Sequence, residues 1–192
     1  MEEGKDGLPV ISFATPALFR DWLDRHQETP GLWLKLAKKA SGQDSVSYSE
    51  ALDIALCFGW IDGQTGRYDE EWTLRRFTPR RARSKWSQIN CKRVEALVAA
   101  GLMEPRGKKE VDEAQADGRW DAAYAGSRTI EIPPDFKKAL AANPVAKAFF
   151  ATISAQNRYA ILFRIHDAKK PATRVARIER FVAMLQEGKT LH

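Results

Sequence analysis

The residues best suited to bind or transform a ligand lie in one segment, residues 73–93, which holds 8 Lys and Arg residues and no Asp or Glu. Its arginines are interleaved with hydroxyls and an indole. A guanidinium offers planar donors that match phosphate or carboxylate, and it also stacks on flat rings. Hydroxyls placed just before a helix, where backbone N–H groups lack intrahelical partners, hold the same kind of anion. The predicted ligand-binding residues are Trp60, Asp62, Arg76, Arg80, Arg81, Ser84, Trp86, Ser87 and Asn90.

Several of these residues also have a structural interpretation. Trp86 is either a stacking platform for a base or another ring, or a core aromatic residue. The arginines either face a ligand or pair with the acidic N-terminal region. Asp62 is the candidate catalytic residue, as a general base; it also suits a role in orienting an arginine, or a salt bridge with Arg76 or Arg80. Gly63, beside it, permits a bulge or a close backbone approach.

Other reactive residue types give weaker signals. Cys57 lies in an apolar stretch, which favours a buried and inert thiol over a nucleophile. The three histidines and two cysteines show no close pairs with metal-ligand spacing, so we expect no metal site. Neither a glycine-rich phosphate loop nor a nucleophile elbow is present, and we expect no cofactor.

The charge alternates in blocks along the 192 residues, with a net charge of +6 overall. Residues 1–72 carry 7 basic and 13 acidic side chains, and residues 133–192 carry 11 and 4. Basic blocks indicate anionic partners, either a small molecule or nucleic acid. The two well-separated cysteines and the absence of a long apolar run predict a cytoplasmic protein without membrane insertion.

Elements in the N-terminal half follow from cap and turn signals. A strand is predicted at residues 9–13 and another at residues 32–37. Between them, Thr15-Pro16 has the residue types of a helix N-cap followed by N1. Ser47 or Ser49 is expected to cap a helix that ends at Gly59. Two strand-like stretches, residues 60–68 and 71–78, then predict a β-hairpin.

The sequence after residue 84 is predicted to be helical. A helix at residues 90–100 and one beginning at Pro105 precede an extended linker, and three or four short helices follow it. The predicted fold is therefore α+β, with an N-terminal mixed sheet-and-helix domain containing the hairpin and then a small C-terminal helical bundle. The domain limits are predicted at residues 1–130 and 131–192.

The chain resembles a known bacterial family over nearly its whole length. Residues 51–64, Ala-Leu-Asp-Ile-Ala-Leu-Cys-Phe-Gly-Trp-Ile-Asp-Gly-Gln, and residues 76–90 resemble signature stretches of the YdeI/OmpD-associated (bacteriocin-protection) family. In the tail, Phe149-Phe150, Arg158-Tyr159, Ala168-Lys169-Lys170 and Thr173-Arg174 are similar to the family's small helical domain. The resemblance implies a link to bacteriocin protection or to an outer-membrane protein, and no particular reaction.

Three functions are consistent with these features. The first is binding of an anionic ligand, either a phosphate-bearing small molecule or nucleic acid, through the arginine-rich segment. The second is small-molecule catalysis by Asp62 with Arg80 and Ser84. The third is interaction with a protein partner in bacteriocin tolerance or envelope stress, which the resemblance suggests.

Overall fold

The computed structural model describes residues 2–4 and 6–192, and the chain divides into two compact units. Unit 1 comprises the residues up to Trp86 together with Asn90–Ala122. Unit 2 comprises Ser87–Ile89 together with Ala123–His192. That residues 1–130 and 131–192 fold as independent domains stays a prediction.

The elements follow the predicted order. In the N-terminal half they are β1 (Val10–Ser12), α1 (Pro16–Arg25), β2 (Leu32–Ala37), α2 (Tyr48–Cys57), β3 (Trp60–Arg67), β4 (Trp72–Pro79), α3 (Gln88–Ala99) and α4 (Pro105–Ala116). In the C-terminal half they are α5 (Pro134–Ala141), α6 (Pro144–Thr152), α7 (Ala155–His166) and α8 (Pro171–Gln186). The α+β class is thus confirmed, with a sheet and helices first and helices alone afterwards.

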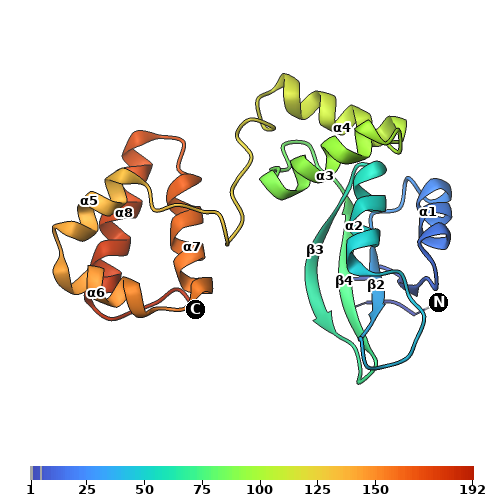
Figure 1. Cartoon of the computed structure of the whole chain (residues 1–192), viewed down its shortest axis with the longest axis horizontal. Helices are drawn as coiled ribbons and strands as arrows, with labels where there is room; N and C mark the ends of the chain where they lie inside the picture. Colours follow the sequence, from blue (N-terminus) through green and yellow to red (C-terminus); the bar gives the residue numbers. More distant parts are fainter. Residues whose placement is uncertain (1, 5) are drawn as a thin grey trace. The chain divides into compact units, whose positions relative to one another are not determined.

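The four strands form one mixed sheet in the order β1-β2-β4-β3 (Figure 1). β1 runs parallel to β2, whereas β4 is antiparallel to both β2 and β3. The predicted hairpin is therefore confirmed as β3–β4. A register shift between Asp62 and Thr65 marks a bulge around Gly63, one of the two roles the sequence indicated for this glycine.

Helices α1 and α2 cover one face of the sheet (Figure 1). Alternate residues of β2, from Leu32 to Leu36, are buried, as expected for a strand with one face in a core. Phe77 of β4 lies edge-on to Phe19 of α1, with ring centroids 5.8 Å apart. Both rings are fully buried, so this helix-covered face holds the core of unit 1.

The two covering helices begin where the sequence predicts. The Thr15 side chain accepts a hydrogen bond from the Leu18 N–H at the start of α1. Ser47, and not Ser49, caps α2, and it forms a reciprocal capping box with Glu50. This cap makes Tyr48 the first residue of α2 and fixes the position of its side chain beside the sheet.

Unit 2 consists of four helices around its own apolar core. Phe136 of α5 and Phe150 of α6 meet perpendicularly, with ring centroids 5.5 Å apart. Ile161 of α7 and Phe181 of α8 complete the buried cluster around them. Because its core is separate from that of the sheet, unit 2 has a packing basis of its own.

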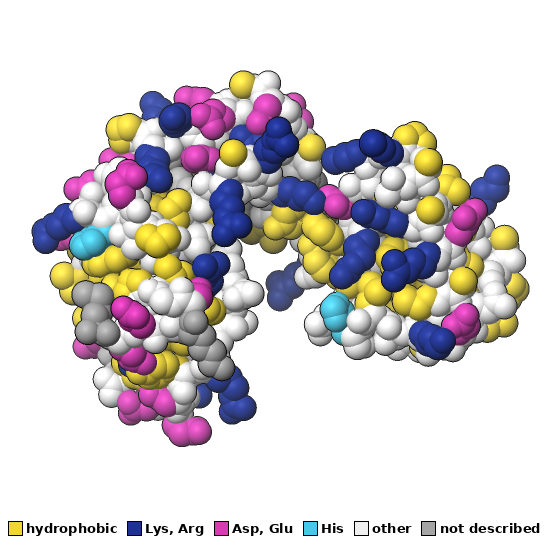
Figure 2. Space-filling model, turned by 180° about the vertical axis from the view of Figure 1, so that it is seen from behind, with side chains coloured by type: hydrophobic (Ala, Val, Ile, Leu, Met, Phe, Trp, Pro, Cys, Tyr) yellow, Lys and Arg dark blue, Asp and Glu magenta, His cyan; other side chains and the backbone are white. Residues whose placement is uncertain are grey.

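The surface is rich in charge. Figure 2 shows Lys and Arg side chains on the visible face of both units, with Asp and Glu side chains among them. Among the residues that the structure describes, no helix is long and apolar enough to cross a membrane.

Candidate functional site

The chain passes from β4 to α3 through residues 80–86, here called the basic loop. The Arg80 N–H donates to the Gly59 carbonyl at 2.9 Å, which anchors the start of the loop beside β3. The Arg80 guanidinium stacks on Trp86, with Cζ 3.4 Å from the ring centroid, and Nη1 donates to the Lys85 carbonyl. Trp120 lies 4.9 Å from the Trp86 ring. Since Arg80 is 6% exposed and Trp86 1%, this stack forms the interior of the loop.

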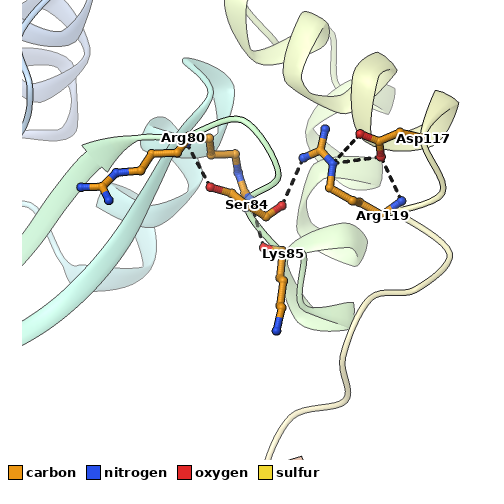
Figure 3. Close-up of polar contacts among 6 residues, drawn as sticks. Arg80, Ser84, Lys85, Asp117 and Arg119 are labelled. Carbon is orange, nitrogen blue, oxygen red and sulfur yellow. Dashed lines mark hydrogen bonds and ion pairs between the residues drawn. The ribbon is translucent and has the colours of Figure 1, made fainter. Parts of the chain in front are cut away.

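Ser84 holds the basic loop closed. Its Oγ accepts a hydrogen bond from the Arg81 N–H at 3.0 Å, and its own N–H donates to the Arg81 carbonyl at 2.9 Å. The Ser84 carbonyl accepts from Arg119 Nη1 at 3.1 Å, while Asp117 fixes the same guanidinium by an ion pair of 2.7 Å (Figure 3). The loop is thus braced from the segment after α4.

Two arginines of the basic loop remain at the surface. Arg81 and Arg83 are exposed, and no described residue forms an ion pair with either guanidinium. Arg83 has φ 68°, the left-handed region that glycine or asparagine adopts at lower cost. An arginine in this conformation costs on the order of 1–3 kcal/mol, and such strain clusters at functional sites.

The remaining residues of the predicted site are distributed over different surroundings. Trp60 is fully buried, and its ring lies edge-on to Trp22 at 6.2 Å. Arg76 pairs with Asp6, Nε to Oδ2, at 3.0 Å. Ser87 and Asn90 are buried and are assigned to unit 2 and unit 1, respectively. Trp60 and Trp86 therefore have the core role that aromatic residues usually take. Of the two roles the sequence allowed for the arginines, Arg76 has the ion pair with the N-terminal region.

Asp62 has different partners from those the sequence indicated. Its Oδ2 accepts a hydrogen bond from the Tyr48 hydroxyl at 2.8 Å and lies 3.5 Å from Arg75 Nη1. Arg75 Cζ lies 4.5 Å from the centroid of the Tyr48 ring, and its Nη1 also donates to the Gly63 carbonyl. The expected salt bridge of Asp62 thus forms with Arg75, not with Arg76 or Arg80.

A groove of about 530 Å³ opens on the helix-covered side of the sheet, next to Asp62, Tyr48 and Arg75. Arg75 and Tyr48 line it, together with Arg67 and Thr65 of β3. None of these four residues was predicted as a site residue. The signal that could have distinguished Arg75 from Arg76 is strand alternation in β4. Adjacent residues of a strand point to opposite faces of the sheet, so only one of the two arginines can face the groove.

The Tyr48 hydroxyl is held protonated. Burial, followed by the hydrogen bond to Asp62, raises the pKa of Tyr48 to about 12 from 10.0. A group whose folded pKa is raised contributes stability that is present below its unfolded pKa and lost as pH rises through the folded value. We therefore expect stability to decline between pH 10 and about 12, and the decline to be shallower in Tyr48→Phe. Urea unfolding of both proteins across this interval, with phenolate absorbance as a second readout, checks the expectation; identical pH dependence would contradict it.

Nucleophilic or metal chemistry gains no support from the described residues. Burial raises the pKa of the Cys57 thiol, and it raises the pKa of Cys91 to about 11. The thiolate is the reactive form, so burial disfavours the reactive form of both cysteines. No group of three His, Cys, Asp or Glu side chains in the described part of the chain is arranged to hold a metal ion.

Comparison with known proteins gives two family matches. Residues 11–110, slightly more than half of the chain, match a domain of unknown function (DUF8412). Residues 129–188 match the family described as bacteriocin-protection, YdeI or OmpD-associated. Neither the curated proteins nor the solved structures searched gave a match. The first match spans the sheet of unit 1 and the basic loop, and the second spans the helices of unit 2.

Proposed function

The chain belongs to the DUF8412 family over residues 11–110 and to the bacteriocin-protection, YdeI or OmpD-associated family over residues 129–188, and we propose that it binds nucleic acid. In this proposal the basic loop contacts the phosphate backbone through Arg81 and Arg83. The observation that carries the proposal is that two exposed guanidiniums stand on a loop whose interior is packed and braced.

Internal ion pairs decide which arginines are available to such a partner. Within unit 1, Arg75 pairs with Asp62, Arg76 with Asp6 and Arg93 with Asp53. A paired guanidinium contributes little net charge to an external phosphate. Arg81 and Arg83 are exposed and form no ion pair with a described residue, which is why the proposal rests on these two.

The bracing of the loop favours binding because a flexible cation loses conformational entropy when it contacts a ligand. Immobilising a long side chain costs roughly 0.5–1.5 kcal/mol, and a mobile backbone adds to that cost. Here the backbone on both sides of Ala82 is already fixed by Ser84, Arg119 and the Arg80–Trp86 stack. The strained backbone of Arg83 is consistent with a functional demand for an arginine at that position.

The proposed contact is with phosphates and not with bases. Trp86, the one aromatic ring of the loop, is buried against Arg80 and Trp120, so it offers no face to a base. Phosphate contacts of arginine carry no sequence information directly. We therefore expect binding that depends strongly on salt and weakly on base sequence.

Anisotropy of a labelled duplex oligonucleotide at low salt tests the proposal. The double variant Arg81→Gln/Arg83→Gln is expected to bind about tenfold or more weakly, because each phosphate contact of a basic side chain is lost for all sequences alike. The matched control is Arg25→Gln/Lys39→Gln, which removes the same charge from exposed positions of unit 1 outside the loop. Equal weakening in both double variants would show that only net charge matters and would overturn the assignment to the loop.

A second candidate function follows from the description of the family that unit 2 matches. That description names bacteriocin protection and association with OmpD, so we also propose a role in tolerance to bacteriocins. Cells lacking the protein should become more sensitive to a bacteriocin, and the wild-type chain should restore tolerance. Unchanged sensitivity of the deletion strain would remove this second function while leaving nucleic-acid binding open to its own test.

A further inference from the structure

The groove beside Tyr48 is separate from the basic loop in both position and chemistry. It lies on the face of the sheet covered by α2 and is lined by two guanidiniums, two threonine hydroxyls and apolar surface from Leu36. Its volume of about 530 Å³ is within the range typical of small-molecule sites, roughly 300–1,000 Å³. We propose that this groove binds a small carboxylate with an apolar body.

The charge of the groove selects the ligand class. Arg67 is exposed at its edge, and Arg75 is partly neutralised by Asp62 at 3.5 Å. The two arginines and this one carboxylate sum to a charge of +1. A monoanion matches that charge, whereas a phosphate monoester, with a charge of about −1.5 to −2 at neutral pH, exceeds it.

Arg75 is held in place before any ligand arrives. The guanidinium Cζ lies 4.5 Å from the centroid of the Tyr48 ring. Its Nη1 forms an ion pair with Asp62 and donates a hydrogen bond to the Gly63 carbonyl. Its Nε is buried without a hydrogen-bond partner among the described residues. Leaving a buried N–H donor unsatisfied is unfavourable, and the contacts of Arg75 with Asp62, Tyr48 and the Gly63 carbonyl offset that cost. A guanidinium that is already positioned suits the recognition of a carboxylate, because its planar donors match carboxylate geometry.

The apolar part of the ligand also has matching surface. Leu36 and Tyr48 both line the groove and supply apolar surface to it. Thr65 and Thr73 add hydroxyl groups beside the arginines. The bulge that brings Thr65 opposite Arg75 shapes this end of the groove, as bulges commonly do next to binding sites.

Backbone amide chemical shifts of the full chain, titrated with benzoate, test the proposal. Saturable shifts are expected in Thr65–Arg67 and Thr73–Arg75, and neutral benzamide at the same concentrations should produce none. Phenyl phosphate should bind more weakly than benzoate. Benzamide binding as well as benzoate, or shifts spread over unrelated surface residues, would overturn the proposal, as would phenyl phosphate binding more tightly.

Two variants assign the effect to the arginines. Arg67→Gln is expected to weaken benzoate binding about tenfold, since a hydrogen bond to a charged group contributes about 1.5 kcal/mol. Arg67 is exposed, so this variant should fold normally even if Arg75→Gln does not. Arg81→Gln/Arg83→Gln should bind benzoate like the wild type, which separates this site from the nucleic-acid proposal. Unchanged affinity in a folded Arg67→Gln would contradict the assignment.

Discussion

Replacing Gly107 by alanine is expected to destabilise unit 1 by about 3 kcal/mol or more, because the added methyl group would clash with backbone atoms of the neighbouring helix. Gly107 lies on α4 where this helix crosses the end of α2. A Cβ at this position would lie 2.0 Å from the Cys57 carbonyl oxygen and 3.0 Å from the Leu56 carbonyl oxygen. Both obstacles are backbone atoms, so no side-chain rotation relieves the clash. Urea unfolding monitored by circular dichroism measures the loss.

Gly63→Ala is the matched control for that experiment. A Cβ at Gly63 would lie 3.8 Å from its nearest neighbour, the Arg76 carbonyl oxygen, which is an ordinary contact. Its φ is not in the left-handed region, so the substitution should change stability by no more than about 1 kcal/mol. If Gly107→Ala were as stable as Gly63→Ala, α4 would not pack against α2 as described.

Trp86→Ala is expected to destabilise the chain by about 3–5 kcal/mol, the usual cost of truncating a buried tryptophan. The ring is 1% exposed and contacts both the Arg80 guanidinium and the Trp120 ring. Its removal leaves a cavity and deprives the buried Arg80 of its cation–π contact. Differential scanning calorimetry, with urea unfolding as a second method, gives the change.

Arg81→Gln supplies the contrast for Trp86→Ala. Arg81 is exposed, and its contact with Ser84 uses the backbone N–H, which the substitution keeps. The free energy of unfolding of the variant should therefore stay within about 0.5 kcal/mol of the wild-type value. A Trp86→Ala protein that kept full stability and lost ligand binding would mean that the ring contacts a ligand. That outcome would return Trp86 to the role of a stacking platform.

The sequence predicted the elements of unit 1 well because their signals are local. Thr15 and Ser47 have cap side chains next to apolar periodic runs, and the structure confirms both caps. The alternation in residues 32–37 specifies one buried face, and β2 has these limits. Helix α3 was predicted to begin at Asn90 and begins two residues earlier, at Gln88, which is a boundary that local propensity fixes poorly.

The composition of the site was harder to predict because it depends on which residues meet across the fold. Arg75 and Arg76 are adjacent and chemically identical, yet Arg75 pairs with Asp62 and Arg76 with Asp6. Tyr48 is distant from Arg75 in sequence and meets it only through the packing of α2 on the sheet. A cluster of positive charge was visible from the sequence, but the acids that neutralise part of it were not assignable to particular arginines.

Trp86 illustrates the same limit for aromatic residues. Its neighbours Ser84, Lys85 and Ser87 are polar, so the local sequence is compatible with an exposed ring. Trp120, whose ring lies beside it, comes from the segment after α4. Only this tertiary contact shows that the ring belongs to the core. An exposed indole and a buried indole in a basic segment have the same neighbours in the sequence.

The most direct test of nucleic-acid binding by the basic loop is the salt dependence of duplex affinity, measured for the wild type and for Arg81→Gln/Arg83→Gln. Each phosphate contact contributes about −0.9 to the slope of log K against log salt concentration. The proposal therefore gives a slope that is less negative by about 1.8 in the double variant, and an unchanged slope in Arg25→Gln/Lys39→Gln. Equal slopes in all three proteins, or no binding by the wild type at low salt, would contradict it.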